Sequence, residues 1–311
     1  MASQKQLPAA SGSVEIILLD GGGFQTTEDW RLHAGGHSRP FYLYDWCFFI
    51  HHKASGKKIL WDLGISNDRS LYTPSVLNFQ WATANPTGPR LALTEQLKAI
   101  GHDPAEIKTV FFRGEFPNAD ALFGPGTLAY CRPGHVQDGQ PTVASQWDSR
   151  FFSDDKNVQT EPYAEFEGPW VPWGPFGAAM DYFGDGSFWI IQAPGHMPGN
   201  LTACGRLPSG EQILLASDCC HSRAIFDGRS QIAVTGPDGS KFCLHSDLDT
   251  ALETIQKIRE AVNSYGMHLA IAHDPEFIRE GKDTVLMSIL HPYLAKKETS
   301  RERHDYSRTA V

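Results

Sequence analysis

The sequence predicts a single α/β domain, built as a sandwich of β-sheets with helices on the outside. Two observations lead to this class: apolar runs of strand length that end in turn residues, and amphipathic segments between some of these runs. A chain of 311 residues suits one large domain or two small ones. We expect a disordered leader at 1–12, one domain at 13–295 and a charged tail at 296–311.

The expected strands are apolar runs bounded by glycine, proline or polar residues. The first strand should end at the glycine triplet 21–23, and the second and third should form a hairpin around Ser55 and Gly56. In chain order, the expected strands cover 14–20, 41–52, 57–64, 106–112, 127–130, 187–192, 200–205, 211–216 and 268–274.

Two helices are predicted from capping residues and apolar periodicity. In the first, at 93–101, Thr94 is placed as the N-cap and Gly101 as the stop. In the second, at 246–266, Ser246 is placed as the N-cap and an apolar stripe follows it. The stripe consists of Leu248, Ala251, Leu252, Ile255 and Ile258.

Residues 131–185 carry few regular signals, and we predict a loop-rich insertion or cap there. The segment contains "EPYAEFEGPWVPWGPFG", which is rich in proline, glycine and aromatic residues. This stretch either packs as a surface insertion or forms a wall of the substrate site. In the second case, Trp170 and Trp173 would contact an acyl or polyketide-like substrate, a hypothesis that rests on composition.

Composition excludes several classes of function. The net charge of −9 and the lack of a basic patch argue against nucleic acid and anionic membranes as partners. The sequence shows no signal-peptide core and no apolar run of about 20 residues, so we expect a cytoplasmic protein. The cysteines have neither disulfide-framework nor C-x-x-C spacing, which fits a reducing compartment. The sequence contains neither a phosphate-binding glycine loop nor a G-x-S-x-G motif, so nucleotide binding and serine hydrolysis lack their usual sequence support. No pattern in the sequence indicates an oligomeric state.

Three apolar strands each run into side chains that can bind a metal. "IIQAPGHMPGN" leads to His196 in a turn fixed by two Pro-Gly pairs, "LLASDCCH" leads to Asp218 and His221, and "AIAHDPEF" leads to His273. Each residue alone is more often a turn or hydrogen-bonding residue. Together they can place imidazole and carboxylate groups, both of which zinc accepts, on one rim of a sheet. We therefore predict a metal site at this rim.

These blocks, together with "ILWDLG" near the start, resemble those of the metallo-β-lactamase superfamily. The resemblance is greatest to the group of N-acyl-homoserine lactone lactonases and their fungal relatives, and it covers 14–290. It implies an αββα sandwich with a dinuclear metal site, usually zinc, at one edge of the two sheets. By the same resemblance, His196 would bind the first metal, Asp218 would bridge both metals, and His273 would bind the second. Asp62 would support the site without binding a metal.

The H-x-H-x-D-H block of this superfamily is absent from the chain. In the family it follows the strand that "EIKTVFF" matches, but here no histidine lies between His102 and His135. The stretch "FPNADALFGPGT" resembles a segment that lies a little downstream of the block in this group. A short block is therefore missing between Phe112 and Arg113, where we expect a locally distorted rim. A deletion, an alternative splice form and an imperfect gene model would each produce this sequence.

The missing block affects the expected metal site. The remaining ligands give two to each metal, whereas catalytic zinc normally has three protein ligands. Glu115, Asp120 and His135 are candidate replacements, although their spacing and order do not match the family. His221 lies near a position where related lactonases often carry a tyrosine that stabilises the oxyanion or the leaving group. His221 would either act as such a catalytic donor or be a supporting or surface histidine.

Two functions from different classes follow from these observations. The first is a metal-dependent hydrolase of the metallo-β-lactamase fold that acts on a small-molecule lactone or related ester, with zinc as cofactor. The alternative is a non-catalytic pseudoenzyme or ligand-binding scaffold that keeps the sandwich and has lost the dinuclear site. A thioesterase or a glyoxalase-type enzyme of the same fold is a third candidate, because one fold hosts many substrates.

Overall fold

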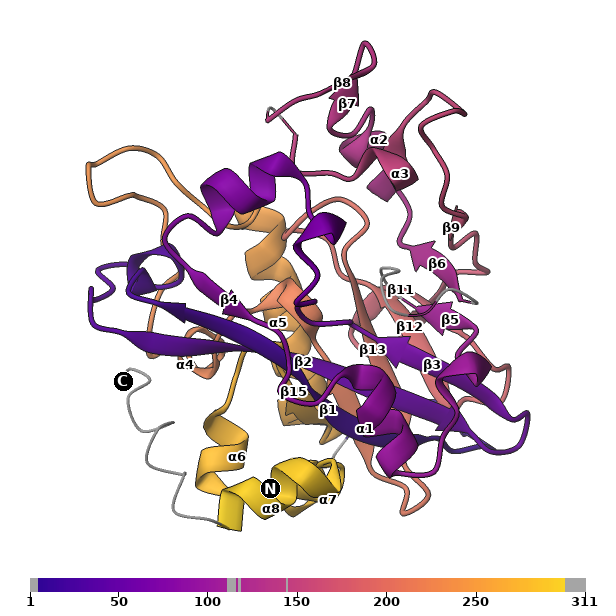
Figure 1. The fold of residues 1–311 in the computed structure, drawn as a ribbon. Helices are drawn as coiled ribbons and strands as arrows, with labels where there is room; N and C mark the ends of the chain where they lie inside the picture. The colour runs from indigo at the N-terminus through magenta and orange to yellow at the C-terminus, as the bar shows by residue number, and fades with distance from the viewer. Residues whose placement is uncertain (1–4, 111–115, 117–118, 144, 300–311) are drawn as a thin grey trace.

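A computed structural model of the chain describes residues 5–110, 116, 119–143 and 145–299. Within this part, two β-sheets pack face to face and helices cover their outer faces (Figure 1). The first sheet has the strand order β4-β1-β2-β3-β5-β6-β9, and the second has the order β10-β11-β12-β13-β14-β15. The predicted αββα sandwich is therefore confirmed.

The strands of the first sheet are β1 (Glu15–Thr26), β2 (Phe41–His52), β3 (Lys57–Trp61), β4 (Asn85–Thr87), β5 (Thr109–Val110), β6 (Asp120–Phe123) and β9 (Tyr163–Glu165). Those of the second are β10 (Val171–Trp173), β11 (Phe176–Asp181), β12 (Phe188–Gln192), β13 (Leu201–Arg206), β14 (Gln212–Leu215) and β15 (His268–Ala270). The hairpin β7 (Val136–Gln137) and β8 (Gln140–Pro141) lies outside both sheets.

The helices are α1 (Leu93–Ala99), α2 (Thr127–Cys131), α3 (Ser149–Phe152), α4 (Arg223–Phe226), α5 (Leu248–Tyr265), α6 (Glu276–Glu280), α7 (Thr284–Ser288) and α8 (Pro292–Thr299). Helix α1 covers the first sheet, α5 covers the second, and α6 to α8 group together at the bottom of the view in Figure 1. None of the described helices has the length and apolar character needed to cross a membrane.

Side-chain alternation along the strands explains the layered core. In β1, Ile16 and Leu18 belong to the core between the sheets, whereas Leu19 packs in the layer that contains Leu97 of α1. Successive side chains on a strand point to opposite faces, so a strand buried on both faces is apolar at nearly every position. The same alternation occurs in β12 and β14, with Phe188, Ile190, Ile213 and Leu215 in the inner core and Ile191 and Leu214 against the α5 layer.

Some predicted elements end or begin elsewhere in the structure. The first strand does not end at the glycine triplet but continues to Thr26, with a register shift between Asp20 and Gly23. Gly22 has a φ of +88°, so the glycines form a bulge within the strand. Residues 127–130 are helical rather than extended. The sequence did not distinguish the two, because a short apolar run carries no period.

The predicted helix caps are also corrected. Helix α1 begins at Leu93, so Thr94 lies inside it and Ala92 occupies the N-cap position. At α5 the N-cap is Asp247, whose carboxylate accepts a hydrogen bond from Thr250 N at 3.1 Å. The backbone of Ser246, the expected cap, is instead hydrogen-bonded to a loop of the second sheet.

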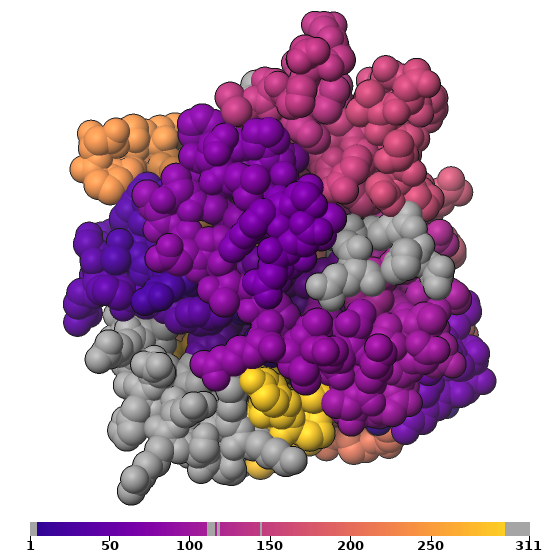
Figure 2. Space-filling view, viewed as in Figure 1, coloured from indigo at the N-terminus to yellow at the C-terminus, as the bar shows by residue number. Residues whose placement is uncertain are grey.

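The segment 131–185 contributes more to the fold than an insertion would. It supplies β9 to the first sheet and both β10 and β11 to the second. Only its first part, with α3 and the β7–β8 hairpin, lies outside the sheets. This part, coloured magenta to pink, projects at the upper right in Figure 2. The prediction of a loop-rich insertion across the whole segment is therefore too broad.

Candidate metal centre

The loops that follow β12, β14 and β15 meet at one end of the second sheet. Because β14 and β15 are parallel neighbours, the loops that follow them leave the sheet at the same edge. These loops bring the predicted residues His196, Asp218 and His273 together. Asp218 Oδ1 lies 2.8 Å from His273 Nε2, and Asp218 Oδ2 lies 3.9 Å from His196 Nε2.

The turn that carries His196 is held against the N-terminus of α5. Ser246 N donates to the carbonyl oxygen of His196 at 2.9 Å, and Asp247 N donates to that of Gly195 at 3.0 Å. Gly195 has a φ of +127°, and a Cβ at this position would lie 2.4 Å from the backbone of Ala251. The turn therefore requires glycine both for its conformation and for its close approach to the helix.

Two further histidines join the cluster. His221 is buried, with Nε2 at 3.8 Å from Asp218 Oδ1, so the surface alternative considered for it is wrong. The sequence patterns did not select His245, although its ring centroid lies 4.9 Å from that of His221 and 5.5 Å from that of His196. The only local signal for His245 is its place just before a predicted helix, because no strand leads into it.

His273 is oriented as a metal-binding histidine often is. Its Nδ1 lies 2.6 Å from the carbonyl oxygen of Tyr44, which can only accept, so Nδ1 donates. This fixes Nε2 toward Asp218. Metal-binding histidines commonly donate their other ring N–H to a backbone carbonyl in this way.

Two more carboxylates lie near Asp218. Asp62 follows β3 with a φ of 60°, and its Oδ2 accepts a hydrogen bond from Ser217 Oγ at 3.4 Å. Asp45, from β2, has its Oδ1 at 3.8 Å from His273 Nδ1. Burial, with the nearby charge of Asp218, raises the pKa of Asp62 to about 8. Burial also raises the pKa of Asp45 to about 6.

The charge at the centre is concentrated on Asp218. Burial alone would raise the pKa of this carboxyl, but the hydrogen bond from His273 and the neighbouring imidazoles hold it well below its usual range. For His273, burial is outweighed by the hydrogen bond to Asp218, and its pKa rises to about 9. Burial lowers the pKa of His221 well below its usual value and that of His245 to about 4. Both of these imidazoles are therefore neutral at pH 7, the form that binds metals.

The donor atoms at this centre suit a transition-metal ion. One donor atom each from Asp218, His221 and His273 lie within 4.8 Å of one another. Of the candidate replacements, Asp120 and His135 are not part of this group. Asp120 is exposed at the start of β6, and the Nδ1 of His135 accepts a hydrogen bond from Ser149 N at 3.1 Å. Glu115 and the junction at 112–113, where a distorted rim was expected, lie outside the described residues.

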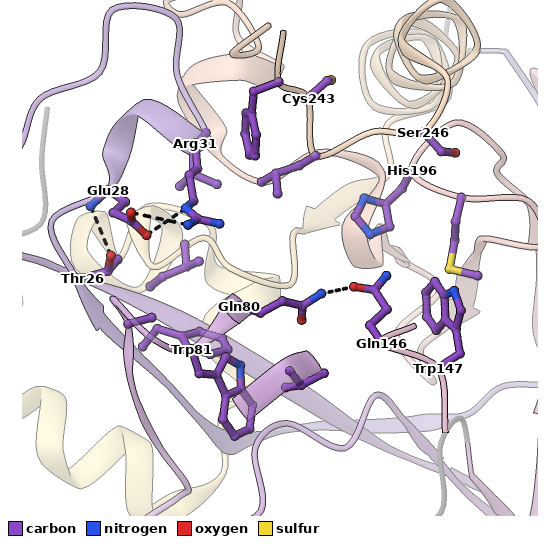
Figure 3. A pocket seen from close by; sticks show the side chains of 18 of the residues that line it. Thr26, Glu28, Arg31, Gln80, Trp81, Gln146, Trp147, His196, Cys243 and Ser246 are labelled. Atoms are coloured by element: carbon purple, nitrogen blue, oxygen red, sulfur yellow. Dashed lines mark hydrogen bonds and ion pairs between the residues drawn. The ribbon is translucent and has the colours of Figure 1, made fainter. Parts of the chain in front are cut away.

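A cavity of about 630 Å³ opens beside His196 (Figure 3). In Figure 3, His196 and Trp147 lie on one side of it and the Arg31–Glu28 ion pair on the other. Trp170 and Trp173 do not line this cavity, and Trp173 is buried in the layer under α5, so the wall proposed for them is wrong. The aromatic lining consists instead of Phe24, Phe41, Trp81, Tyr130, Trp147 and Phe242.

A second cavity, of about 330 Å³, is lined by His221, His273 and the Arg223 side chain, among other residues. Leu32 and Leu43 line both cavities. The histidines around Asp218 therefore face two adjoining cavities, with His196 on the larger and His221 and His273 on the smaller. A ligand in either cavity can reach the cluster.

Comparisons with known proteins agree with this fold. No protein-family model matches the chain. Metallo-hydrolase mfmC of Annulohypoxylon moriforme is 26% identical over 321 residues, covering 86% of this chain and 80% of its own. N-acyl homoserine lactonase AttM of Rhizobium johnstonii is 27% identical over 195 residues, covering 58% of this chain and 63% of its own. Cytochrome P450 monooxygenase mpaDE of Penicillium roqueforti is 24% identical over 86% of this chain, but the match spans only 34% of that longer protein.

Two solved structures share the fold. An N-acyl homoserine lactone hydrolase with N-hexanoyl-L-homoserine at its catalytic metal centre superposes with a TM-score of 0.58 at 15% identity, covering 86% of this chain and 96% of its own. AidC, a dizinc quorum-quenching lactonase, gives 0.52 at 15% identity, covering 88% and 91%. The fold and the Asp–His cluster thus define a protein of the metallo-β-lactamase fold. In sequence the chain is similar to a metallo-hydrolase and to N-acyl homoserine lactonases.

Proposed function

We propose that this protein is a zinc-dependent hydrolase that acts on a lactone or a related ester. The observation that carries the proposal is the meeting of the Asp218 carboxylate with several imidazoles beside an aromatic cavity. Its relatives support the class, since they include a metallo-hydrolase and N-acyl homoserine lactonases. Zinc accepts carboxylate and imidazole ligands, and AidC is a dizinc protein of the same fold.

The residues present fit at least one metal ion. Asp218 is the common donor, and His196, His221 and His273 are candidates for the remaining positions. When bound, the ion would polarise an ester carbonyl and lower the pKa of a water molecule. The hydrogen bond from His273 to the carbonyl oxygen of Tyr44 holds that imidazole in place, which limits reorganisation on ligation. A donor atom of His221 lies within 4.8 Å of donor atoms of Asp218 and His273. We therefore favour a role for His221 as a metal ligand over a role as oxyanion donor.

The larger cavity determines which esters the protein can hold. Its aromatic lining favours a substrate with an apolar or aromatic body, and its volume suits a small molecule. The guanidinium of Arg31 is paired with Glu28 at 2.8 Å and lies over the ring of Phe242. Arg31 therefore offers hydrogen bonds without a large net charge, which suits a neutral oxygen-bearing group.

The proposal is tested with a panel of γ- and δ-lactones that carry alkyl or aryl groups, N-hexanoyl-homoserine lactone among them. Protein loaded with Zn²⁺ should hydrolyse at least one of them; a chelator should abolish the activity, and added Zn²⁺ should restore it. Release of acid at constant pH measures the rate. Folded, zinc-loaded protein that hydrolyses none of the panel would overturn the proposal and favour the non-catalytic scaffold.

Replacing Trp147 with alanine should raise the KM for the active lactone by about tenfold, because loss of one aromatic wall costs on the order of 1.4 kcal/mol. Trp147 packs with Met197, which follows His196, and lines the cavity. The value of kcat should change little, because the metal centre is untouched. Trp170→Ala is the control, since Trp170 does not line this cavity. Equal effects of the two variants on KM would show that the substrate binds elsewhere.

A further inference from the structure

Among the described residues, no hydrogen-bond partner explains the position of the His245 side chain. Its side chain is only 4% exposed. Neither ring nitrogen of His245 has a hydrogen-bond partner among the described residues, and both nitrogens are shielded from solvent. Buried imidazoles normally form a hydrogen bond through at least one nitrogen. Both nitrogens are thus available to a ligand that is not a side chain of the described protein.

The backbone fixes His245 beside the turn of His196. The next residue, Ser246, donates its N–H to the carbonyl oxygen of His196 at 2.9 Å, and His245 N itself donates to Cys243 Sγ at 3.4 Å. The Nδ1 of His196 is likewise buried without a described hydrogen-bond partner. Two imidazoles with unsatisfied nitrogens are therefore held next to each other by the fold.

The rings of His196, His221 and His245 form a nearly equilateral triangle. Their centroids are 5.2 Å apart for His196 and His221, 5.5 Å for His196 and His245, and 4.9 Å for His221 and His245. With Zn–N bonds of about 2.0 Å and tetrahedral angles, three imidazoles on one ion have centroids about 5 Å apart. The rings are also inclined to one another, by 69°, 88° and 42°, rather than stacked. The centroid spacing therefore matches that of three imidazoles around a common ion. As the side chains lie, the donor atoms within 4.8 Å of one another are those of Asp218, His221 and His273, so a common ion requires the rings of His196 and His245 to turn a nitrogen toward it.

We propose that His245 is a metal ligand and that, with His196 and His221, it supplies three imidazoles to one divalent ion. Asp218, whose oxygens lie 3.9 Å from His196 Nε2 and 3.8 Å from His221 Nε2, is the fourth protein donor. His273 then acts by orienting Asp218 through their hydrogen bond. This inference rests on the metal-binding part of the proposed function. It gives the chain a ligand set that does not need the H-x-H-x-D-H block.

The test measures Zn²⁺ affinity by competition with a chromophoric chelator, and ligation by the visible absorption of Co²⁺-loaded protein. His245→Ala should weaken Zn²⁺ binding by at least about 100-fold, since the loss of a residue that only supports a ligand already costs about 10–100-fold. It should also change the Co²⁺ spectrum. His245→Gln, which preserves more of the side-chain volume, should give the same result and guards against misfolding of the alanine variant. Near-ultraviolet circular dichroism of the metal-free variants checks that both are folded.

His51→Ala is the matched control. Donor atoms of Glu15, His51 and His102 also lie within 4.8 Å of one another, so this second group could bind Zn²⁺ and add to the measured binding. His51→Ala removes one donor from that group and leaves the proposed site unchanged. Unchanged affinity and an unchanged Co²⁺ spectrum in both His245 variants would overturn the inference while leaving the proposed hydrolase standing. Zinc binding that depends on His245 in a protein that hydrolyses no lactone would support the inference and overturn the proposed activity. Wild-type protein that binds no zinc would overturn both.

Discussion

Replacing Asp218 with asparagine should remove stoichiometric zinc from the protein and lower hydrolysis on the order of 10³-fold or more. Asp218 is the acceptor on which His196, His221 and His273 converge, with nitrogens between 2.8 Å and 3.9 Å from its oxygens. Asparagine has nearly the same shape but carries no negative charge and only one oxygen. The variant therefore tests the charge at the centre of the cluster rather than its packing.

Elemental analysis of the purified variant and rates on the active lactone measure this effect. Asp283→Asn is a suitable control, because Asp283 also pairs with a histidine, His268, at 2.8 Å, but away from the metal centre. Asparagine can still cap α7 there, so the fold should be kept. A D218N protein with full zinc content would contradict the role assigned to the carboxylate.

Replacing Gly195 with alanine should lower the free energy of unfolding by about 3 kcal/mol or more. At a φ of +127° an alanine is strained, and its Cβ would lie 2.4 Å from both the N and the Cα of Ala251. The turn would have to move away from α5. Because the same turn carries His196, zinc affinity should fall together with stability.

Urea unfolding of metal-free protein measures the stability change, and chelator competition measures the affinity change. Gly184→Ala isolates the backbone strain, since Gly184 has a φ of +79° and no atom within 4 Å of the added Cβ. That control should cost about 1 kcal/mol and leave zinc binding unchanged. If G195A and G184A are equally stable, the turn does not depend on its contact with α5.

Patterns along the chain were sufficient to predict the layered fold. The strand 41–52 was predicted with the bounds that β2 has in the structure. Strands β12, β13 and β14 were also predicted to within one residue at each end. These segments are long or strongly apolar, and their turns contain glycine or proline, so local sequence and tertiary structure favour the same conformation. Residues 127–130 are short and have no period, and packing decides that they are helical.

The site was predicted only where a strand leads into it. His196, Asp218 and His273 each follow an apolar strand, and the structure brings these three together. Asp45 lies within β2, and His245 lies in a loop before α5, so no local pattern distinguishes them from other polar residues. They reach the cluster through pairing and packing between segments far apart in sequence.

The sequence by itself determined the layered α/β architecture, the bounds of strands such as β2 and β12 to β14, and the absence of the H-x-H-x-D-H block. Periodicity, turn residues and motifs are local properties, and they can be recognised without knowing which segments touch. Only the tertiary structure decided that His221 is buried and that His245 lies beside both His196 and His221. It also decided that the cavity beside His196 is lined by Trp147 rather than by Trp170 and Trp173. These facts depend on long-range packing, in which loops anchored on different strands and helices are brought to a common edge.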